Sequence, residues 1–102
     1  MARRVSTKQR PQLAIVDARI AYDRQITDLG RRLYIALFAS EPLLDSPQWI
    51  TVSARDWSTK LGCTAETVRN ALSRLAQRGF IERERTPGAR TQHVRRVMTL
   101  HA

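Results

Sequence analysis

The sequence of 102 residues is poor in metal-binding and redox residues, having one cysteine and two histidines. Cys63 has no partner for an internal disulfide, and with only His93 and His101 the chain lacks the paired ligands of a zinc finger. No apolar run approaches the roughly 20 residues of a membrane-spanning helix, and the basic N-terminus lacks the apolar stretch of a signal peptide. We therefore expect a protein of the reducing cytoplasm, with no metal, no cofactor and no membrane partner.

Motifs for catalysis are also missing. The sequence contains no glycine-rich phosphate loop, no nucleophile elbow and no HExxH pair. Asp17, Asp23 and Asp28 recur near a helical period and could suggest a metal-dependent nuclease, but each lies beside an arginine or at a capping position. We expect that the chain is not an enzyme.

Acidic residues are few: nine Asp and Glu stand against 18 Lys and Arg, which gives a net charge of +9. Only Lys8 and Lys60 are lysines, so the positive charge is almost entirely arginine, whose planar fork suits phosphate and guanine. This excess indicates a polyanionic partner, nucleic acid before an anionic membrane, although genomic base bias also raises arginine content. Aromatic residues make up 6%, too few for the stacking surfaces of a single-strand or RNA binder.

The chain divides into a basic arm over 1–12, with Arg3, Arg4, Lys8 and Arg10, and a domain over 13–102. Leu13–Ile26 alternates weakly, which favours an extended stretch over a short helix. Thr27 or Asp28 caps a helix with an apolar stripe that includes Ile35 and ends near Ser40–Glu41, before Pro42. Trp49–Val52 has the composition of a short strand.

Capping residues predict two further helices. Ser53 begins one that ends at Leu61–Gly62, and Thr64 begins another that ends at Arg78–Gly79. Strands over Phe80–Thr86 and Val94–Leu100 are then joined through Pro87–Gly88 by a loop of six to seven residues, which makes a hairpin. We expect Trp49 and Trp57 in the core and Cys63 as a buried plug beside the turn.

The two capped helices have the spacing of a helix-turn-helix, with Ser58 four residues before Gly62 and Val68 and Ala71 facing the first helix. The segments 64–72 and 75–81 resemble winged helix-turn-helix domains of GntR-type regulators and of plasmid and phage replication proteins. The second resemblance extends upstream through 19–22 and 26–37. It implies a mainly α (α+β) fold with three helices and a C-terminal hairpin wing. No effector-binding domain follows the wing here, so we expect no small-molecule ligand.

The resemblance implies that the third helix enters the major groove by its N-terminal half. Arg69 could read guanine or grip phosphate, Asn70 could pair with adenine, and Glu66 could accept from cytosine. Arg90 at the hairpin tip could enter the minor groove. The basic N-terminal arm could be a second segment that binds there. The full set of expected DNA-binding residues is Thr64, Ala65, Glu66, Thr67, Arg69, Asn70, Ser73, Arg74, Arg85, Arg90, Arg95 and Arg96.

The sequence thus predicts a sequence-specific double-stranded DNA-binding protein, associated with nucleoid or plasmid, acting as a small transcriptional regulator without an effector domain. A plasmid- or phage-type replication or partition (centromere-binding) factor is the alternative, and a winged-helix protein-interaction adaptor is a second one. One small module reads few base pairs, so we expect a homodimer or a cooperative array. The candidate partner surface comprises Leu13, Ile15, Ile20, Tyr22 and Tyr34.

Overall fold

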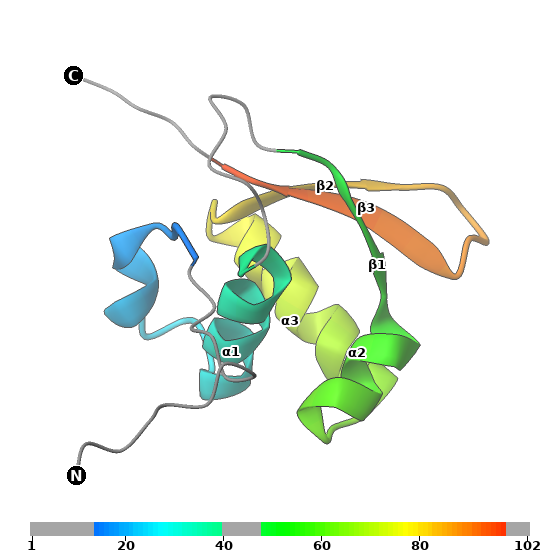
Figure 1. Cartoon of the computed structure of the whole chain (residues 1–102), viewed down its shortest axis with the longest axis horizontal. Helices are drawn as coiled ribbons and strands as arrows, with labels where there is room; N and C mark the ends of the chain where they lie inside the picture. Colours follow the sequence, from blue (N-terminus) through cyan, green and yellow to red (C-terminus); the bar gives the residue numbers. More distant parts are fainter. Residues whose placement is uncertain (1–13, 40–47, 98–102) are drawn as a thin grey trace, which may run out of the picture.

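A computed structural model describes residues 14–39 and 48–97. Apart from a first 3-10 helix, its helices and strands follow one another in the order that the capping residues and apolar patterns predict. They are a 3-10 helix η1 (Ala18–Ala21), α1 (Asp28–Phe38), β1 (Ile50–Ser53), α2 (Ala54–Leu61), α3 (Ala65–Gln77), β2 (Ile81–Arg85) and β3 (Thr91–Arg96). The strands form one antiparallel sheet in the order β1-β3-β2, and the α-helices lie on one side of it (Figure 1). An α+β chain with three α-helices is therefore confirmed among the described residues, and the hairpin belongs to a three-stranded sheet.

Each α-helix begins at a hydroxyl residue that accepts a hydrogen bond from a backbone N–H of the first turn. Thr27 accepts from the Gly30 amide at 3.0 Å, Ser53 from the Asp56 amide at 3.2 Å, and Thr64 from the Thr67 amide at 3.1 Å. Such a cap satisfies a backbone donor that the helix itself cannot satisfy. The predicted starts of α2 and α3 are confirmed, and Thr27 rather than Asp28 caps α1.

The core lies between the helices and the inner face of the sheet. Strand alternation turns Val52, Ile81 and Val94 toward the helices, where all three are buried. Tyr34 contacts the ring edges of Phe38 and Phe80, with centroids 5.4 Å and 5.7 Å away. The largest fully buried side chains are Tyr34, Phe38, Phe80, Leu33, Leu72, Leu75, Val52, Val68 and Val94.

The preference for an extended Leu13–Ile26 is wrong in its middle part, where η1 forms. Asp17 accepts a hydrogen bond from the Arg19 amide, and the Ile20 amide donates to the Asp17 carbonyl. This local capping closes a turn that weak apolar alternation does not signal. The arm over 1–12 and the predicted helix end at Ser40–Glu41 lie outside the described residues, and α1 is described to Phe38.

The hairpin also differs from the prediction. The second strand is Thr91–Arg96, not Val94–Leu100, and the residues between the strands are 86–90, a shorter loop than predicted. Thr91, Gln92 and His93 join the strand because they pair with Ser53, Val52 and Thr51 of β1. Gln92 and His93 pair with β2 as well. Residues 98–100 lie outside the described part of the chain.

Two apolar side chains expected inside lie partly outside. Trp49 is 43% exposed at the start of β1, and Ile35 is 45% exposed on the outer side of α1. Trp57, expected in the core, and Cys63, expected as a buried plug, are half-buried and pack against the core from its edge. Strand alternation predicts that neighbours face opposite ways, but only the sheet's register shows that Ile50 rather than Trp49 faces the helices.

Candidate nucleic-acid interface

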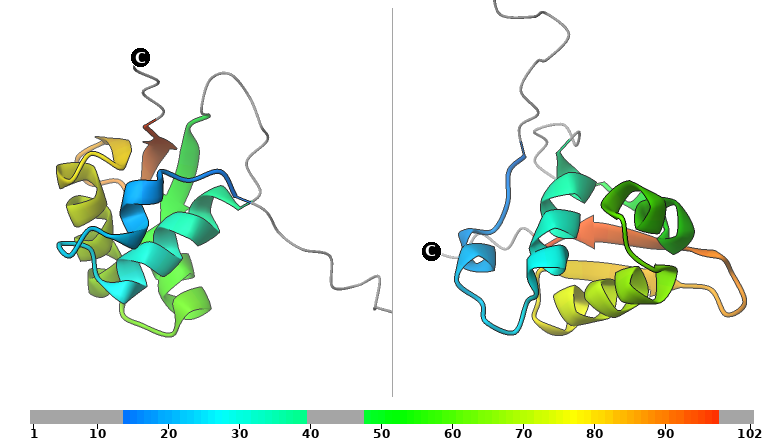
Figure 2. Two further views of the ribbon diagram at one scale, coloured as in Figure 1. Left: turned by 90° about the vertical axis from the view of Figure 1, so that its left-hand side faces the viewer. Right: turned by 90° about the horizontal axis from the view of Figure 1, so that it is seen from below.

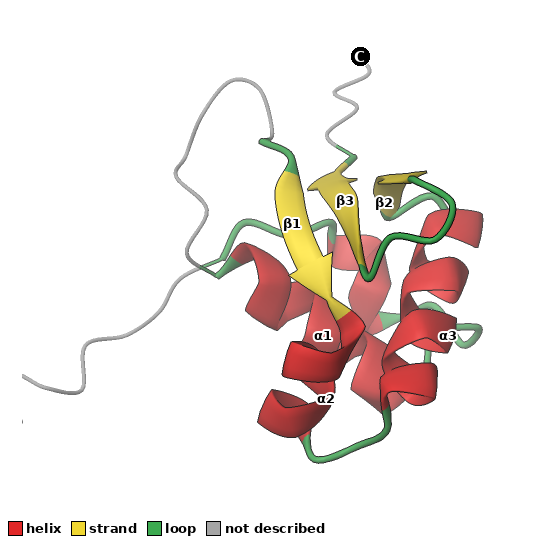
Figure 3. Ribbon diagram, turned by 90° about the vertical axis from the view of Figure 1, so that its right-hand side faces the viewer, coloured by secondary structure: helices red, strands yellow, loops and turns green. Residues whose placement is uncertain are grey.

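The turn between α2 and α3 fixes the position of α3. Gly62 ends α2 in the left-handed conformation, with φ 71° and ψ 40°, and its N–H donates to the Ser58 carbonyl. The Cys63 amide donates to the same carbonyl at 3.0 Å, and Thr64 then caps α3. The two helices pack side by side, and α2 follows β1 without a break (Figure 3).

One side of α3 is buried and the other is exposed to solvent. Val68, Ala71, Leu72 and Leu75 face the core, as the apolar spacing predicts. The expected recognition residues Thr64, Glu66, Thr67, Arg69, Asn70 and Arg74 are exposed, and Ala65 and Ser73 are half-buried. The structure therefore brings these residues together on or beside one helix face.

The hairpin extends past the N-terminal end of α3 (Figure 2). Residues of the hairpin, of α3 and of the start of α2 line an open hollow of about 480 Å³. Three of the expected residues, Arg69, Arg85 and Arg90, line it together. Arg85 reaches this side because it pairs with Gln92, on the inner face of the sheet. The complete lining is Ala54, Arg69, Arg85, Thr86, Pro87, Gly88, Ala89, Arg90, Thr91 and Gln92, without a carboxylate.

The arginines of this region have no ion pair among the described residues. Within residues 14–39 and 48–97, the ion pairs involve Arg19, Arg31, Arg78 and Arg95, and none reaches Arg69, Arg74, Arg85 or Arg90. Burial, followed by repulsion from Arg85, lowers the pKa of Arg83 from its ordinary value. An anion beside Arg83 and Arg85 would relieve the repulsion between their guanidinium groups.

Arg83 is a residue that sequence reasoning missed. It pairs with Val94, so it lies on the same inner face as Arg85, two residues along β2. The period of two in Arg83 and Arg85 was a usable signal, because alternate residues share a face. Glu82 and Glu84, the residues before and after Arg83, lie on the opposite face.

Arg95 and Arg96, two of the expected DNA-binding residues, do not line the hollow. Arg95 lies on the outer face of the sheet, 4.6 Å from the Trp49 ring centroid, and pairs with Glu82 at 3.2 Å. Arg96 is 3% exposed, lies over the Phe38 ring and donates to the Ile15 carbonyl. A guanidinium buried in this way is not presented to a duplex.

A second hollow, of about 260 Å³, lies on the other side of α3, against the start of α1. Thr67, Asn70 and Arg74 line it from α3, with no carboxylate among its lining residues. A shallower hollow beside it shares Gln25 and includes Arg24. The partners from the first part of the chain are Gln25, Ile26, Thr27 and Gly30.

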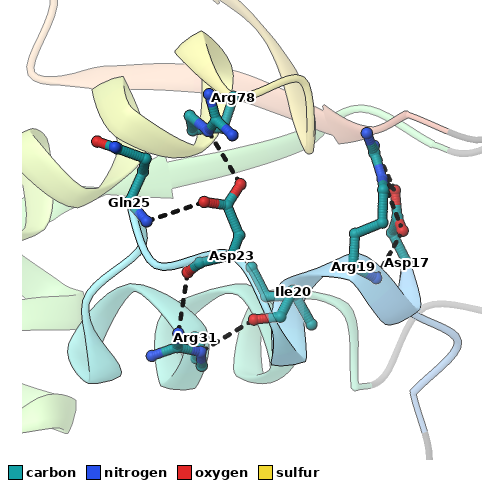
Figure 4. Close-up of polar contacts among 7 residues, drawn as sticks. All are labelled: Asp17, Arg19, Ile20, Asp23, Gln25, Arg31 and Arg78. Atoms are coloured by element: carbon teal, nitrogen blue, oxygen red, sulfur yellow. Dashed lines mark hydrogen bonds and ion pairs between the residues drawn. The ribbon is translucent and has the colours of Figure 1, made fainter.

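The segment before α1 is tied to the rest of the domain by polar contacts (Figure 4). Asp23 accepts a hydrogen bond from Arg78 at 2.9 Å, and Arg31 donates to the carbonyls of Ile20 and Asp23, each at 2.9 Å. Burial alone would raise the pKa of Asp23, but bonds from Arg78 and the Gln25 amide outweigh it and lower the pKa.

The three aspartates considered as a metal site each contact an arginine. Asp17 pairs with Arg19 at 2.6 Å, Asp23 with Arg78, and Asp28 with Arg31 at 2.8 Å. In the part of the chain that the structure describes, no three His, Cys, Asp or Glu side chains are placed to hold a metal ion.

The expected partner surface does not form a continuous patch. Ile20 and Tyr34 are buried in the core, and Leu13 lies outside the described residues. Ile15 and Tyr22 are exposed, at 43% and 83%. Of the four expected surface residues that the structure describes, two are therefore exposed and two are buried.

Comparison with other proteins found no matching family model, no similar curated protein and no similar solved structure. Within the described residues, no helix is both long and apolar enough to span a bilayer.

Proposed function

We propose that the chain is a winged helix-turn-helix protein that binds duplex DNA in a sequence-specific manner. The observation that carries this proposal is the convergence of Arg69, Arg85 and Arg90 on one open hollow without a carboxylate. The order of elements and the strand order β1-β3-β2 support the winged-helix assignment. The resemblance of residues 64–81 to winged helix-turn-helix domains adds to it.

The geometry of α3 suits a duplex better than a small anion. An α-helix with its side chains is about 10–12 Å wide, and the major groove of B-DNA is about 12 Å wide. Glu66 and Asn70 lie on the exposed face of α3 and can accept from or pair with base edges. The hairpin arginines then meet the adjacent phosphates, whose contacts contribute affinity rather than sequence preference.

In this proposal the protein acts at DNA as a small transcriptional regulator, or as a plasmid- or phage-type replication or partition factor. It binds as a homodimer or as a cooperative array, because one helix covers few base pairs. The layout of the binding site separates these roles. An inverted repeat indicates a two-fold dimer and a regulator, and tandem direct repeats indicate a replication or partition array.

The experiment is selection of bound duplexes from a random pool at physiological salt with competitor DNA, followed by sequencing. We expect an enriched motif, and Asn70→Ala should change its composition. Arg85→Gln and Arg90→Gln should weaken binding to all duplexes, whereas the control Arg32→Gln, on the outer side of α1, should not. Failure of the wild-type chain to bind any duplex would overturn the proposal.

A protein-interaction adaptor is the second candidate, and the exposed Trp49 favours it. Trp49 lies beside Arg95 on the sheet face that the α-helices do not cover. Aromatic and arginine side chains together are typical of interface centres. Duplex binding without an enriched motif, and unchanged by Arg69→Ala, would favour the adaptor over a sequence reader.

A further inference from the structure

The exposed face of α3 has a polar centre and a positively charged residue on each side. Taking 100° per residue, Glu66, Asn70, Ser73 and Gln77 form a central stripe, and Arg69 and Arg74 lie about 70° to either side of it. The stripe holds hydrogen-bonding groups and a single charge, that of Glu66. The two flanks are where a helix lying in a groove meets the two phosphate backbones.

The two flanks face different hollows. Arg69 faces the hollow shared with the hairpin, and Arg74 lines the hollow shared with the start of α1. Arg24 lines the shallow hollow that adjoins the second one at Gln25. Neither Arg24 nor Arg74 has an ion pair within the described residues.

The carboxylate that lines the shallow hollow is already paired within the protein. Asp23 lines the shallow hollow with Arg24, but it accepts the hydrogen bond from Arg78 and another from the Gln25 amide. Asp23 is ionised at neutral pH, and its pairing with Arg78 helps to lower its pKa. The charges of Arg24 and Arg74 are therefore left for a partner outside the chain.

We propose that the hollow between α3 and the start of α1 receives the phosphate backbone of the DNA strand opposite the one held by the hairpin. Arg74 and Arg24 contact that strand, with Gln25, Thr67 and Asn70 beside it. This proposal rests on the proposed function, because it specifies how the duplex lies on α3. Arg69 was predicted either to read guanine or to bind phosphate, and this proposal assigns it to phosphate. Base reading is left to Glu66, Asn70, Ser73 and Gln77.

The size of the hollow and its lining agree with a backbone phosphate. At about 260 Å³ it is smaller than the pockets of most drug-sized ligands. Its polar lining offers the Arg74 guanidinium, the Thr67 hydroxyl and the Gln25 amide, all of which can donate to phosphate oxygens. A duplex gripped on both sides of α3 is held in one orientation, so the central stripe meets defined base edges.

The test is a salt titration of duplex binding by fluorescence anisotropy, from about 50 mM to about 200 mM salt. Arg74→Gln and Arg24→Gln should each reduce the slope of log K against log salt by about 0.9, as Arg85→Gln should on the hairpin side. A loss of 0.9 in slope corresponds to about a 3.5-fold smaller change in affinity over this range. Arg74→Lys should retain the slope, and Arg32→Gln is the matched charge control.

Ethylation interference on the selected duplex then assigns the strands. Arg74→Gln should erase interference on one strand only, and Arg85→Gln on the other. Wild-type slopes for both Arg24→Gln and Arg74→Gln, with a reduced slope for Arg85→Gln, would overturn this inference and leave the proposed function standing. Failure of the wild-type chain to bind duplex would overturn both.

Discussion

Replacing Gly62 by alanine tests whether the turn between α2 and α3 depends on a left-handed residue. A Cβ built at Gly62 meets no atom within 4 Å, so the cost comes from the backbone conformation alone. An L-residue in the left-handed region costs about 1–2 kcal/mol, and alanine recovers about 0.4–1 kcal/mol by restricting the unfolded chain. We expect Gly62→Ala to lower the free energy of unfolding by about 1 kcal/mol and therefore to lower Tm by about 4–8 °C.

Urea denaturation followed by circular dichroism measures this change, and Gly62→Asn is the matched control. Asparagine tolerates the left-handed region better than alanine, so its loss should be smaller. Because the added Cβ touches nothing, duplex affinity per folded molecule should remain that of the wild type. Equal stability of Gly62→Ala and wild type, or a larger loss for Gly62→Asn, would refute a left-handed end of α2.

Three further substitutions test other contacts. Thr64→Ala removes the hydroxyl that accepts from the Thr67 amide and should lower the free energy of unfolding, measured by urea denaturation, by about 1 kcal/mol. Thr64→Ser should restore most of this stability. Unchanged stability of Thr64→Ala would mean that the cap does not stabilise the fold. Asp23 has a pKa below its ordinary 3.8, so its contribution to stability is present above that pH and is lost as pH falls through the folded value. The urea midpoint should therefore fall more steeply below about pH 4 for the wild type than for Asp23→Asn, and equal slopes would contradict the Arg78 contact. Arg96→Gln should cost about 1.5–3 kcal/mol of stability yet leave the salt slope of duplex binding unchanged, and a reduced slope would place this side chain against DNA.

The predicted ends of α2 and the start of α3 agree with the structure because their determinants are local. Ser53, Gly62 and Thr64 act on backbone groups no more than four residues away. A hydroxyl cap and a left-handed glycine can be predicted from the local sequence, without the rest of the fold. The composition of the exposed face of α3 follows from the same local periodicity.

The segment before α1 and the start of β3 were not predictable in this way. Asp23 and Arg78 are 55 residues apart in sequence, and their contact fixes where the loop before α1 lies. Likewise, Thr91 and Gln92 become strand residues because β1 provides partners for them across the sheet. Such pairings depend on tertiary structure, which overrides weak local preference.

Residue type alone also misjudged two side chains at the end of the sheet. Trp49 was expected inside and lies on the outer face, whereas Arg96 was expected outside and is buried. The register pairs Ile50 with Val94 and puts both on the inner face, so Arg96, two residues after Val94, follows them inward. Its long apolar stem and the Phe38 ring make that position tolerable for a guanidinium.

The distribution of charge carries more information than its sum. A net charge of +9 fits both a polyanion partner and a genome that favours arginine codons. Genomic base bias raises the number of arginines but does not determine where paired and unpaired arginines lie on the surface. Yet the described ion pairs lie before α1, on α1, at the end of α3 and on the outer sheet face. The arginines without one include Arg69 and Arg74 on the flanks of α3 and Arg85 and Arg90 of the hairpin, which line the hollows on either side of α3. This grouping favours a polyanion partner over base bias as the source of the charge.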